Sequence, residues 1–144
     1  MVRPVPDRYP VSLGYRQKMK SRPLYVHRGI DYAAPVGTIA VAAIAGTVVH
    51  AGTGGLGPAF GTHVIIRTSG IFHLYAHLSR ADVHKDEWVA AGQTIGKTGA
   101  TGNVTGPHLH YAEFTAYNYK ADRRPRLLDH RPAAKIESPA FAQN

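Results

Sequence analysis

The 144-residue sequence contains no cysteine. Disulfide bonds, thiolate catalysis and cysteine-based zinc sites are therefore excluded, and any metal ion must be held by histidine and carboxylate side chains. The sequence has nine histidines, as many as its aspartates and glutamates together. Histidines are thus the first candidates for metal ligands and catalytic residues.

Long apolar runs are also missing. No stretch approaches the roughly 18 consecutive apolar residues of a membrane span. The first ten residues, MVRPVPDRYP, have neither the apolar core nor the cleavage site of a secretory signal. We therefore expect no membrane span, no signal peptide, and synthesis in the cytoplasm with some other route for any action outside it.

Helical periodicity is absent as well, because no segment of ten or more residues places apolar side chains at 3.6-residue spacing. Short runs rich in β-branched and aromatic residues recur instead, at residues 38–52, 62–68, 71–79 and 108–114. Residues 52–61, GTGGLGPAFG, contain five glycines and must form a loop. The length and this pattern predict a single, mainly β domain with little helix.

Positive charge is concentrated at the two ends. Residues 1–26 carry six Lys/Arg and one acid, residues 27–117 carry five of each, and residues 118–144 carry six Lys/Arg and three acids. We predict a basic, extended and weakly structured N-terminal segment (1–26), a central domain (27–117) and a basic Pro- and Arg-rich tail (118–144). Such ends favour polyanions, although solvated tails explain them equally well.

Histidines and aspartate form three local pairs with even spacing, which places the members of each pair on one face of an extended strand. The pairs are His27 with Asp31 in HRGID, His73 with His77 in HLYAH, and His108 with His110 in HLH. Each pair alone arises easily by chance. Catalytic zinc, however, takes three His or carboxylate ligands and keeps one open position, and it lowers the pKa of bound water to about 7. His27, Asp31 and one histidine of the HLH pair would complete such a set, leaving other imidazoles for acid–base work.

Four blocks then resemble one family in order. The segments HRGIDYAAPVGTIAVAAIAGTVVHAG, LYAHLS, VAAGQTIGKTGATG and TGPHLH resemble the lysostaphin/LytM-type zinc peptidases, the M23 peptidase family, over about residues 27–114. The resemblance implies a twisted antiparallel β-sheet with a groove walled by loops. It also implies one Zn²⁺ ion held by His27, Asp31 and His110, with His77 and His108 as the catalytic histidines.

The sequence departs from this family in two places. Family members usually read HLH, an aromatic residue and then Glu, whereas HLHYAEF moves the acid to Glu113, which on a regular strand does not share the histidines' face. The loop tyrosine near the metal has no clear match, although Tyr25 is close. We assign His73 a structural or surface role on the face of His77, and we expect solvated imidazoles at four further positions: His50, His63, His84 and His130.

The resemblance implies a zinc metallo-endopeptidase that hydrolyses peptide bonds in bacterial peptidoglycan, with specificity set by loops such as 52–61 and 80–87. A minimal domain without a signal peptide fits a monomeric phage endolysin, released onto the wall from the host cytoplasm, whose basic ends bind anionic wall polymers. A bacterial autolysin or bacteriocin with the same activity is the alternative biological role. The alternatives are a non-catalytic wall-binding or regulatory relative and a biotinyl/lipoyl-type carrier domain, which requires a lysine on a tight hairpin. No nucleic-acid-binding motif accompanies the basic ends.

Overall fold

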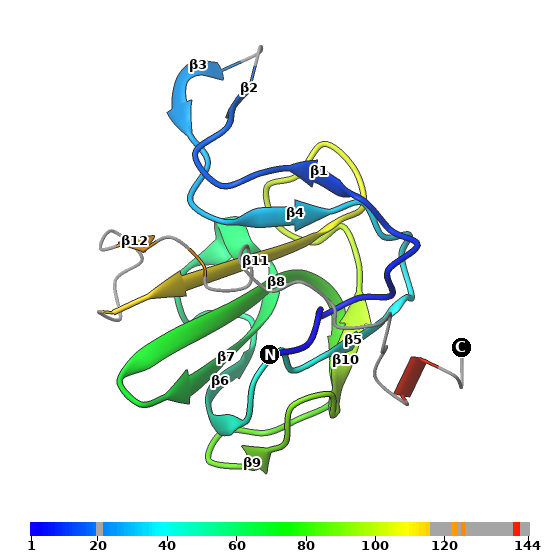
Figure 1. Ribbon diagram of the computed structural model, residues 1–144, viewed down its shortest axis with the longest axis vertical. Helices are drawn as coiled ribbons and strands as arrows, with labels where there is room; N and C mark the ends of the chain where they lie inside the picture. Colours follow the sequence, from blue (N-terminus) through cyan, green and yellow to red (C-terminus); the bar gives the residue numbers. More distant parts are fainter. Residues whose placement is uncertain (20–21, 116–121, 124, 126–139, 142–144) are drawn as a thin grey trace.

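Short strands and tight turns build one large antiparallel sheet (Figure 1). The computed structural model describes residues 1–19, 22–115, 122–123, 125 and 140–141. Its elements are β1 (Val11–Leu13), β2 (Lys18–Met19), β3 (Arg22–Val26), β4 (Ile30–Tyr32), β5 (Ile39–Val41), β6 (Gly46–Gly52), η1 (Pro58–Phe60), β7 (Thr62–Thr68), β8 (Ile71–Ala81), β9 (Trp88–Val89), β10 (Thr94–Thr98), β11 (Leu109–Phe114) and β12 (Asp122–Arg123). Within these ranges helix is limited to 3-10 turns, so the mainly β prediction is confirmed.

Ten of the described strands belong to the main sheet. Its central path runs β1-β4-β11-β8-β7-β6-β9, while β10 pairs with both β5 and β8, and β12 pairs with β11. The hairpin expected over residues 62–79 is formed by β7 and β8, which are joined through Ser69 and Gly70. Both turn residues have positive φ, 49° and 77°, as a two-residue type I′ turn requires.

The middle of the sheet is buried on both faces. The larger core lies on one face and includes Val64, Tyr75 and Tyr111. The opposite face carries a smaller cluster that includes Leu74 and Phe114, against which Phe60 of the 52–61 loop packs. Strand β11, which carries His110, therefore lies between the main core and the smaller cluster.

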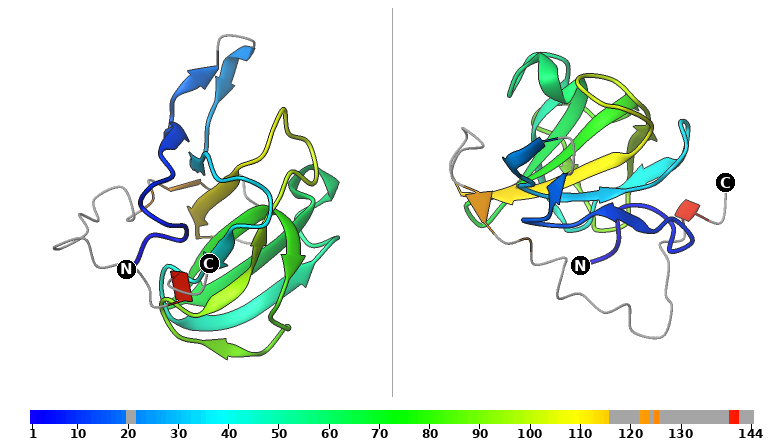
Figure 2. Two further views of the ribbon diagram at one scale, coloured as in Figure 1. Left: turned by 90° about the vertical axis from the view of Figure 1, so that its right-hand side faces the viewer. Right: turned by 90° about the horizontal axis from the view of Figure 1, so that it is seen from above.

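Part of the N-terminal segment packs against the sheet, although the sequence predicted it to be weakly structured. Val5 is fully buried in the main core. The amide of Val2 donates to the carbonyl of Ala43 (2.8 Å), that of Val41 donates to Pro4 (2.9 Å), and β1 pairs with β4. The reason is that β4 and β5 would otherwise leave open sheet edges, which short non-periodic segments can cover. The proposed division at residue 26 stays a prediction, and β2 and β3 form a separate hairpin that projects from the sheet (Figure 2).

His63 is buried, so the solvated imidazole expected at this position is a wrong prediction. Its Nδ1–H donates to the carbonyl of Gly61 (2.9 Å), and its Nε2 accepts from the amide of Leu56 (3.2 Å). The loop after β6 folds back over the ring, and His50 packs against it at 4.4 Å between ring centroids. His50 is half-buried and His84 is exposed, while His130 lies outside the described residues.

The buried neutral ring makes stability dependent on pH. Burial lowers the pKa of His63, and a protonated ring could not accept from Leu56. This contribution to the free energy of unfolding is therefore complete above about pH 6.5, the ordinary histidine pKa, and is lost as the pH falls through the lower folded-state pKa. We expect urea unfolding at pH 7.5 and pH 5 to show a smaller loss of stability in His63→Gln than in the unchanged protein. Equal losses would contradict this assignment.

No helix among the described residues is long and apolar enough to cross a membrane.

Candidate active site

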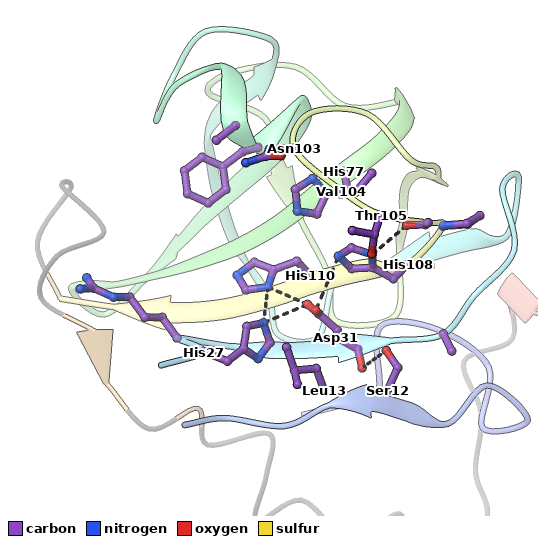
Figure 3. A pocket seen from close by; sticks show the side chains of 16 residues that line it. Ser12, Leu13, His27, Asp31, His77, Asn103, Val104, Thr105, His108 and His110 are labelled. Carbon is purple, nitrogen blue, oxygen red and sulfur yellow. Dashed lines mark hydrogen bonds and ion pairs between the residues drawn. The ribbon is translucent and has the colours of Figure 1, made fainter. Parts of the chain in front are cut away.

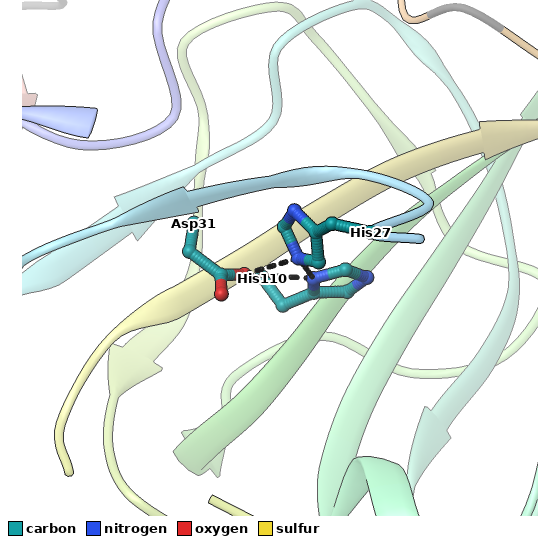
Figure 4. Close-up of side chains that lie close together, drawn as sticks. All are labelled: His27, Asp31 and His110. Carbon is teal, nitrogen blue, oxygen red and sulfur yellow. Dashed lines mark hydrogen bonds and ion pairs between the residues drawn. The ribbon is translucent and has the colours of Figure 1, made fainter. Parts of the chain in front are cut away.

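Three metal-binding atoms converge where β4 lies beside β11 (Figure 4). His27 lies just before β4, and Asp31 and His110 are direct partners in the antiparallel pairing of β4 with β11. Oδ1 of Asp31 lies 3.1 Å from Nε2 of His27 and 2.8 Å from Nδ1 of His110, and the two nitrogens are 3.2 Å apart. Ligand atoms about 2.0–2.1 Å from a tetrahedral ion would be about 3.3 Å apart. The three residues are nearly as close as they would be around zinc.

The ring orientations and the carboxylate of this cluster suit a cation at its centre. Nδ1–H of His27 donates to the carbonyl of Gly14 (3.0 Å), so a neutral His27 presents the lone pair of Nε2 to the cluster. Burial alone would raise the pKa of Asp31, but hydrogen bonds and charges of His110 and His27 hold it well below its usual range. Burial lowers the pKa of His110. When both rings are deprotonated, as metal binding requires, two buried imidazole nitrogens and one buried carboxylate oxygen point at a common centre, which fits a divalent metal.

Gly29 allows the His27–Asp31 segment to approach β11. A Cβ atom at this position would collide with the carbonyl oxygen of Tyr111 and would lie 2.8 Å from Cε1 of His110. The HRGID motif thus needs a residue without a side chain between His27 and Asp31, because the ring of His110 passes beside it.

Gly29→Ala is expected to shift His110 and weaken metal binding at least tenfold, with a loss of about 1–3 kcal/mol in stability from overpacking. Gly14→Ala is the matched control, since Gly14 also adjoins a ligand but its Cβ would meet only Oε1 of Gln17 at 3.5 Å. Zinc titration followed by calorimetry measures both variants. Unchanged affinity in Gly29→Ala would show that the close approach is not needed.

His77 faces the same groove because β8 has a bulge there. Its φ is 64°, and the register between β7 and β8 shifts between Thr62 and Val64. Nδ1–H of His77 donates to the carbonyl of Thr101 (2.8 Å), which leaves Nε2 as the proton-accepting nitrogen. Burial, followed by the neighbouring His110, lowers the pKa of His77 to about 4, so the ring is neutral at pH 7.

His108 packs against His77, with ring centroids 4.9 Å apart. Its Nδ1–H donates to the carbonyl of Gly106 (3.0 Å). Its Nε2 lies 3.6 Å from Oδ2 of Asp31. Two imidazoles with fixed Nδ1–H groups thus adjoin the three-residue cluster, each with Nε2 available for proton transfer.

His73 does not share a face with His77, contrary to the prediction from even spacing. The bulge shifts the alternation of side chains between Tyr75 and Leu78, so it turns His77 to the groove while His73 stays on the core side, where it is buried. Its Nδ1–H donates to the hydroxyl of Tyr111 (2.9 Å), which donates to Oε2 of Glu113 (2.9 Å). The structural role expected for His73 is confirmed. The pairing of β11 with β8 is regular through Glu113, so the side chain of Glu113 does not face His110.

A groove of about 740 Å³, open to solvent, is lined by all five candidate site residues (Figure 3): His27, Asp31, His77, His108 and His110. Ser12 and Leu13 of β1 form one wall, and residues 103–107 with Ala59 and Phe60 form the opposite one. The sequence reasoning missed the β1 wall, since nothing in VSL signals it. Residues 80–87 do not line the described groove; they pack beside β6 through hydrogen bonds such as Val48 to Glu87 (2.8 Å). Tyr25 lies in β3, and its side chain is outside the described part.

Comparison with known proteins places this groove among peptidases. The pattern of peptidase family M23 matches residues 25–121. Peptidoglycan DD-endopeptidase ShyC of Vibrio cholerae is 49% identical over 86 residues, which are 59% of this chain and 19% of ShyC. The chain spans about a fifth of the length of the curated relatives that it matches.

Two solved structures share the fold over most of the chain. The catalytic domain of the antimicrobial peptidase lysostaphin from Staphylococcus simulans has a TM-score of 0.76 at 27% identity, covering 85% of this chain and 92% of that domain. A mutant catalytic domain of the prophage-encoded M23 protein EnpA from Enterococcus faecalis has a TM-score of 0.73 at 29% identity, covering 90% of this chain and 98% of that one.

Proposed function

Because the chain belongs to peptidase family M23, we propose that it is a zinc-dependent endopeptidase that hydrolyses peptide bonds of bacterial peptidoglycan, in stem peptides or in their cross-links. The observation that carries this proposal is the convergence of His27, Asp31 and His110 in one groove beside His77 and His108. The names of ShyC, a peptidoglycan endopeptidase, and of lysostaphin, an antimicrobial peptidase, support it.

The three clustered residues would hold one zinc ion. When bound, zinc would polarise the scissile carbonyl group and acidify a water molecule. Asp31 contributes the single negative charge, and the two neutral imidazoles contribute none, so the site keeps net positive charge for the oxyanion that develops on the substrate.

His77 and His108 would move the protons. The Nε2 lone pair of a neutral imidazole accepts a proton from the attacking water, and the resulting imidazolium donates a hydrogen bond to the tetrahedral oxyanion or passes the proton to the leaving amine. The carbonyls of Thr101 and Gly106 hold the two rings in the required tautomer. An open groove with a wall on each side suits an extended peptide.

Digestion of defined peptidoglycans, with and without a chelator, tests this function. We expect new free amino termini by mass spectrometry in the untreated sample, none with chelator, and recovery on adding zinc. Release of new reducing sugars without new amino termini would overturn the proposal, because it would mean that a glycan bond is cut. The position of the new terminus also identifies the bond.

A role in phage lysis is a further proposal, supported by the likeness to a prophage-encoded M23 protein. The likeness to ShyC supports a bacterial wall enzyme as the alternative. For a lysis enzyme made in the host cytoplasm, expression inside a bacterium should leave cells intact until the membrane is permeabilised, and then lyse them. Lysis without permeabilisation would contradict this localisation.

We also propose that the basic ends bind anionic wall polymers. Arg3 serves the fold, since it donates to the carbonyls of Pro6 and Tyr9 and lies over the ring of Tyr32. Arg16 and Lys18 are exposed. An Arg16→Gln/Lys18→Gln variant should therefore show weaker and less salt-dependent binding to purified walls. Identical salt dependence would argue against a contribution from these two residues.

A further inference from the structure

Thr101 connects to the bulge that presents His77 through three hydrogen bonds. Its hydroxyl donates to the carbonyl of Leu78 (2.6 Å) and accepts from the amide of Thr62 (3.1 Å), and its own carbonyl accepts from Nδ1 of His77 (2.8 Å). Thr62 and Leu78 are register partners in β7 and β8. The hydroxyl therefore serves backbone groups of both strands at the point where the ladder is irregular.

A bulge needs such a partner. Register shifts interrupt the pairing of β8 with β7 before Leu78 and with β10 between Lys97 and Thr98. Backbone groups released from a ladder must find other hydrogen-bond partners when they are sheltered from water. At this break the side chain of Thr101 satisfies both the carbonyl of Leu78 and the amide of Thr62. The carbonyl of the same residue orients the imidazole of His77.

The segment around Thr101 is also locked to the groove wall. The amide of Asn103 donates to the carbonyl of Ala59 (2.9 Å). Gly61 and Gly102 have positive φ, 61° and 82°. A Cβ at Gly61 would collide with Oγ1 of Thr101, and one at Gly102 would collide with the carbonyl oxygen of Ala59. The two glycines thus let residues 101–103 lie directly against the end of the 52–61 loop.

We propose that Thr101 is the positioning residue of His77: its hydroxyl clamps the bulge between β7 and β8, so that its carbonyl holds the imidazole in the Nδ1–H tautomer with Nε2 facing the reaction. This inference rests on the proposed function for its effect on rate, but not for its effect on the tautomer. The hydroxyl is the essential group, because the carbonyl is present in every residue type.

Thr101→Val keeps the volume and removes the hydroxyl, whereas Thr101→Ser keeps the hydroxyl. We expect Thr101→Val to lose roughly tenfold to a hundredfold in kcat, with KM within about twofold and bound zinc unchanged, and Thr101→Ser to stay near the unchanged protein. Equal losses in Ser and Val variants, or full activity in Val, would overturn the proposal.

The tautomer of His77 is read directly from ¹⁵N chemical shifts of its ring, and this measurement needs neither activity nor metal. The unchanged protein should show Nδ1–H, and Thr101→Val should show a mixture or Nε2–H. An Nε2–H tautomer in the unchanged protein overturns the inference even if Thr101→Val does not fold. An inactive protein with the expected tautomers would instead count against the proposed function.

A second variant displaces the hydroxyl without changing Thr101. Gly61→Ala places a methyl group against Oγ1 and the carbonyl carbon of Thr101 and against the amide nitrogen of Gly102, so it displaces both the hydroxyl and the carbonyl, and it should reproduce the kcat loss and the tautomer change. Gly54→Ala is its matched control, because Gly54 has a φ of 81° in the same loop but its Cβ would meet nothing within 4 Å. If both alanine variants lose the same activity, backbone strain rather than the hydroxyl clamp is responsible, and the proposal fails.

Discussion

Replacing His108 or His77 with alanine is expected to lower kcat/KM about 100- to 10,000-fold while the protein keeps its zinc. Each ring supplies one Nε2 lone pair beside the cluster, and neither belongs to the group formed by His27, Asp31 and His110. Removing a ring therefore removes proton transfer and oxyanion stabilisation but leaves all three ligands in place.

Two measurements separate this result from simple loss of structure. Zinc content by plasma mass spectrometry should equal that of the unchanged protein, and thermal unfolding should remain cooperative. His84→Ala is the control, because His84 is exposed and outside the groove. Hydrolysis by His108→Ala at the unchanged rate would remove His108 from the mechanism, and the same outcome for His77 would remove His77.

Alanine at His27, Asp31 or His110 should instead abolish the metal site itself. Each substitution leaves two of the three ligands, and hydrolysis should fall to background at any pH. The three atoms lie only 2.8–3.2 Å apart, so the loss of any one of them opens a gap in a compact cluster. Asp31→Asn is the most informative variant, since it keeps the shape and removes the only negative charge of the cluster.

Zinc-dependent stabilisation provides a readout without substrate. Zinc at 100 times its Kd should raise the free energy of unfolding of the unchanged protein by about 2.7 kcal/mol. The Asp31→Asn, His27→Ala and His110→Ala variants should show no such increase, whereas His108→Ala should keep it. A zinc-dependent increase of equal size in Asp31→Asn would show that the ion binds elsewhere.

The pairing of His27 with Asp31 could be predicted from the sequence because their spacing in HRGID is local. His110 and Asp31 occupy adjacent strands in direct register, and His27 is brought back by a short turn that Gly29 permits. Residue reasoning alone required one histidine of the HLH pair, and only the family resemblance selected His110. In the structure Nδ1 of His110 lies near Asp31 and His27, and the roles of these residues as ligands stay predictions.

Periodicity failed where the strand was irregular. Equal spacing put His73 and His77 on one face, but the positive φ of His77 shifts the alternation by one residue, and His73 lies in the core. No single-sequence signal marks that bulge, because its partner Thr101 lies 24 residues away. In contrast, Glu113 follows the regular alternation, and it faces Tyr111 and His73 as that alternation requires.

The packing of loops and edge strands was the second source of error. His63 looked like a strand-end imidazole, yet the 52–61 loop folds over it and supplies two backbone partners. Ser12 and Leu13 gained their place in the groove through pairing of β1 with β4. The first feature depends on how a glycine-rich loop folds back on the adjoining strand, and the second on strand pairing between separate segments; composition and spacing encode neither.

The central claim is that one zinc ion, held by His27, Asp31 and His110, is required for peptide-bond hydrolysis. The most direct measurement is the rate of release of free amino groups from cross-linked peptidoglycan as zinc is titrated into chelator-treated protein. We predict no release from the metal-free protein and a rise that saturates at about one zinc ion per chain. Full hydrolysis by protein shown to contain no metal would contradict the account.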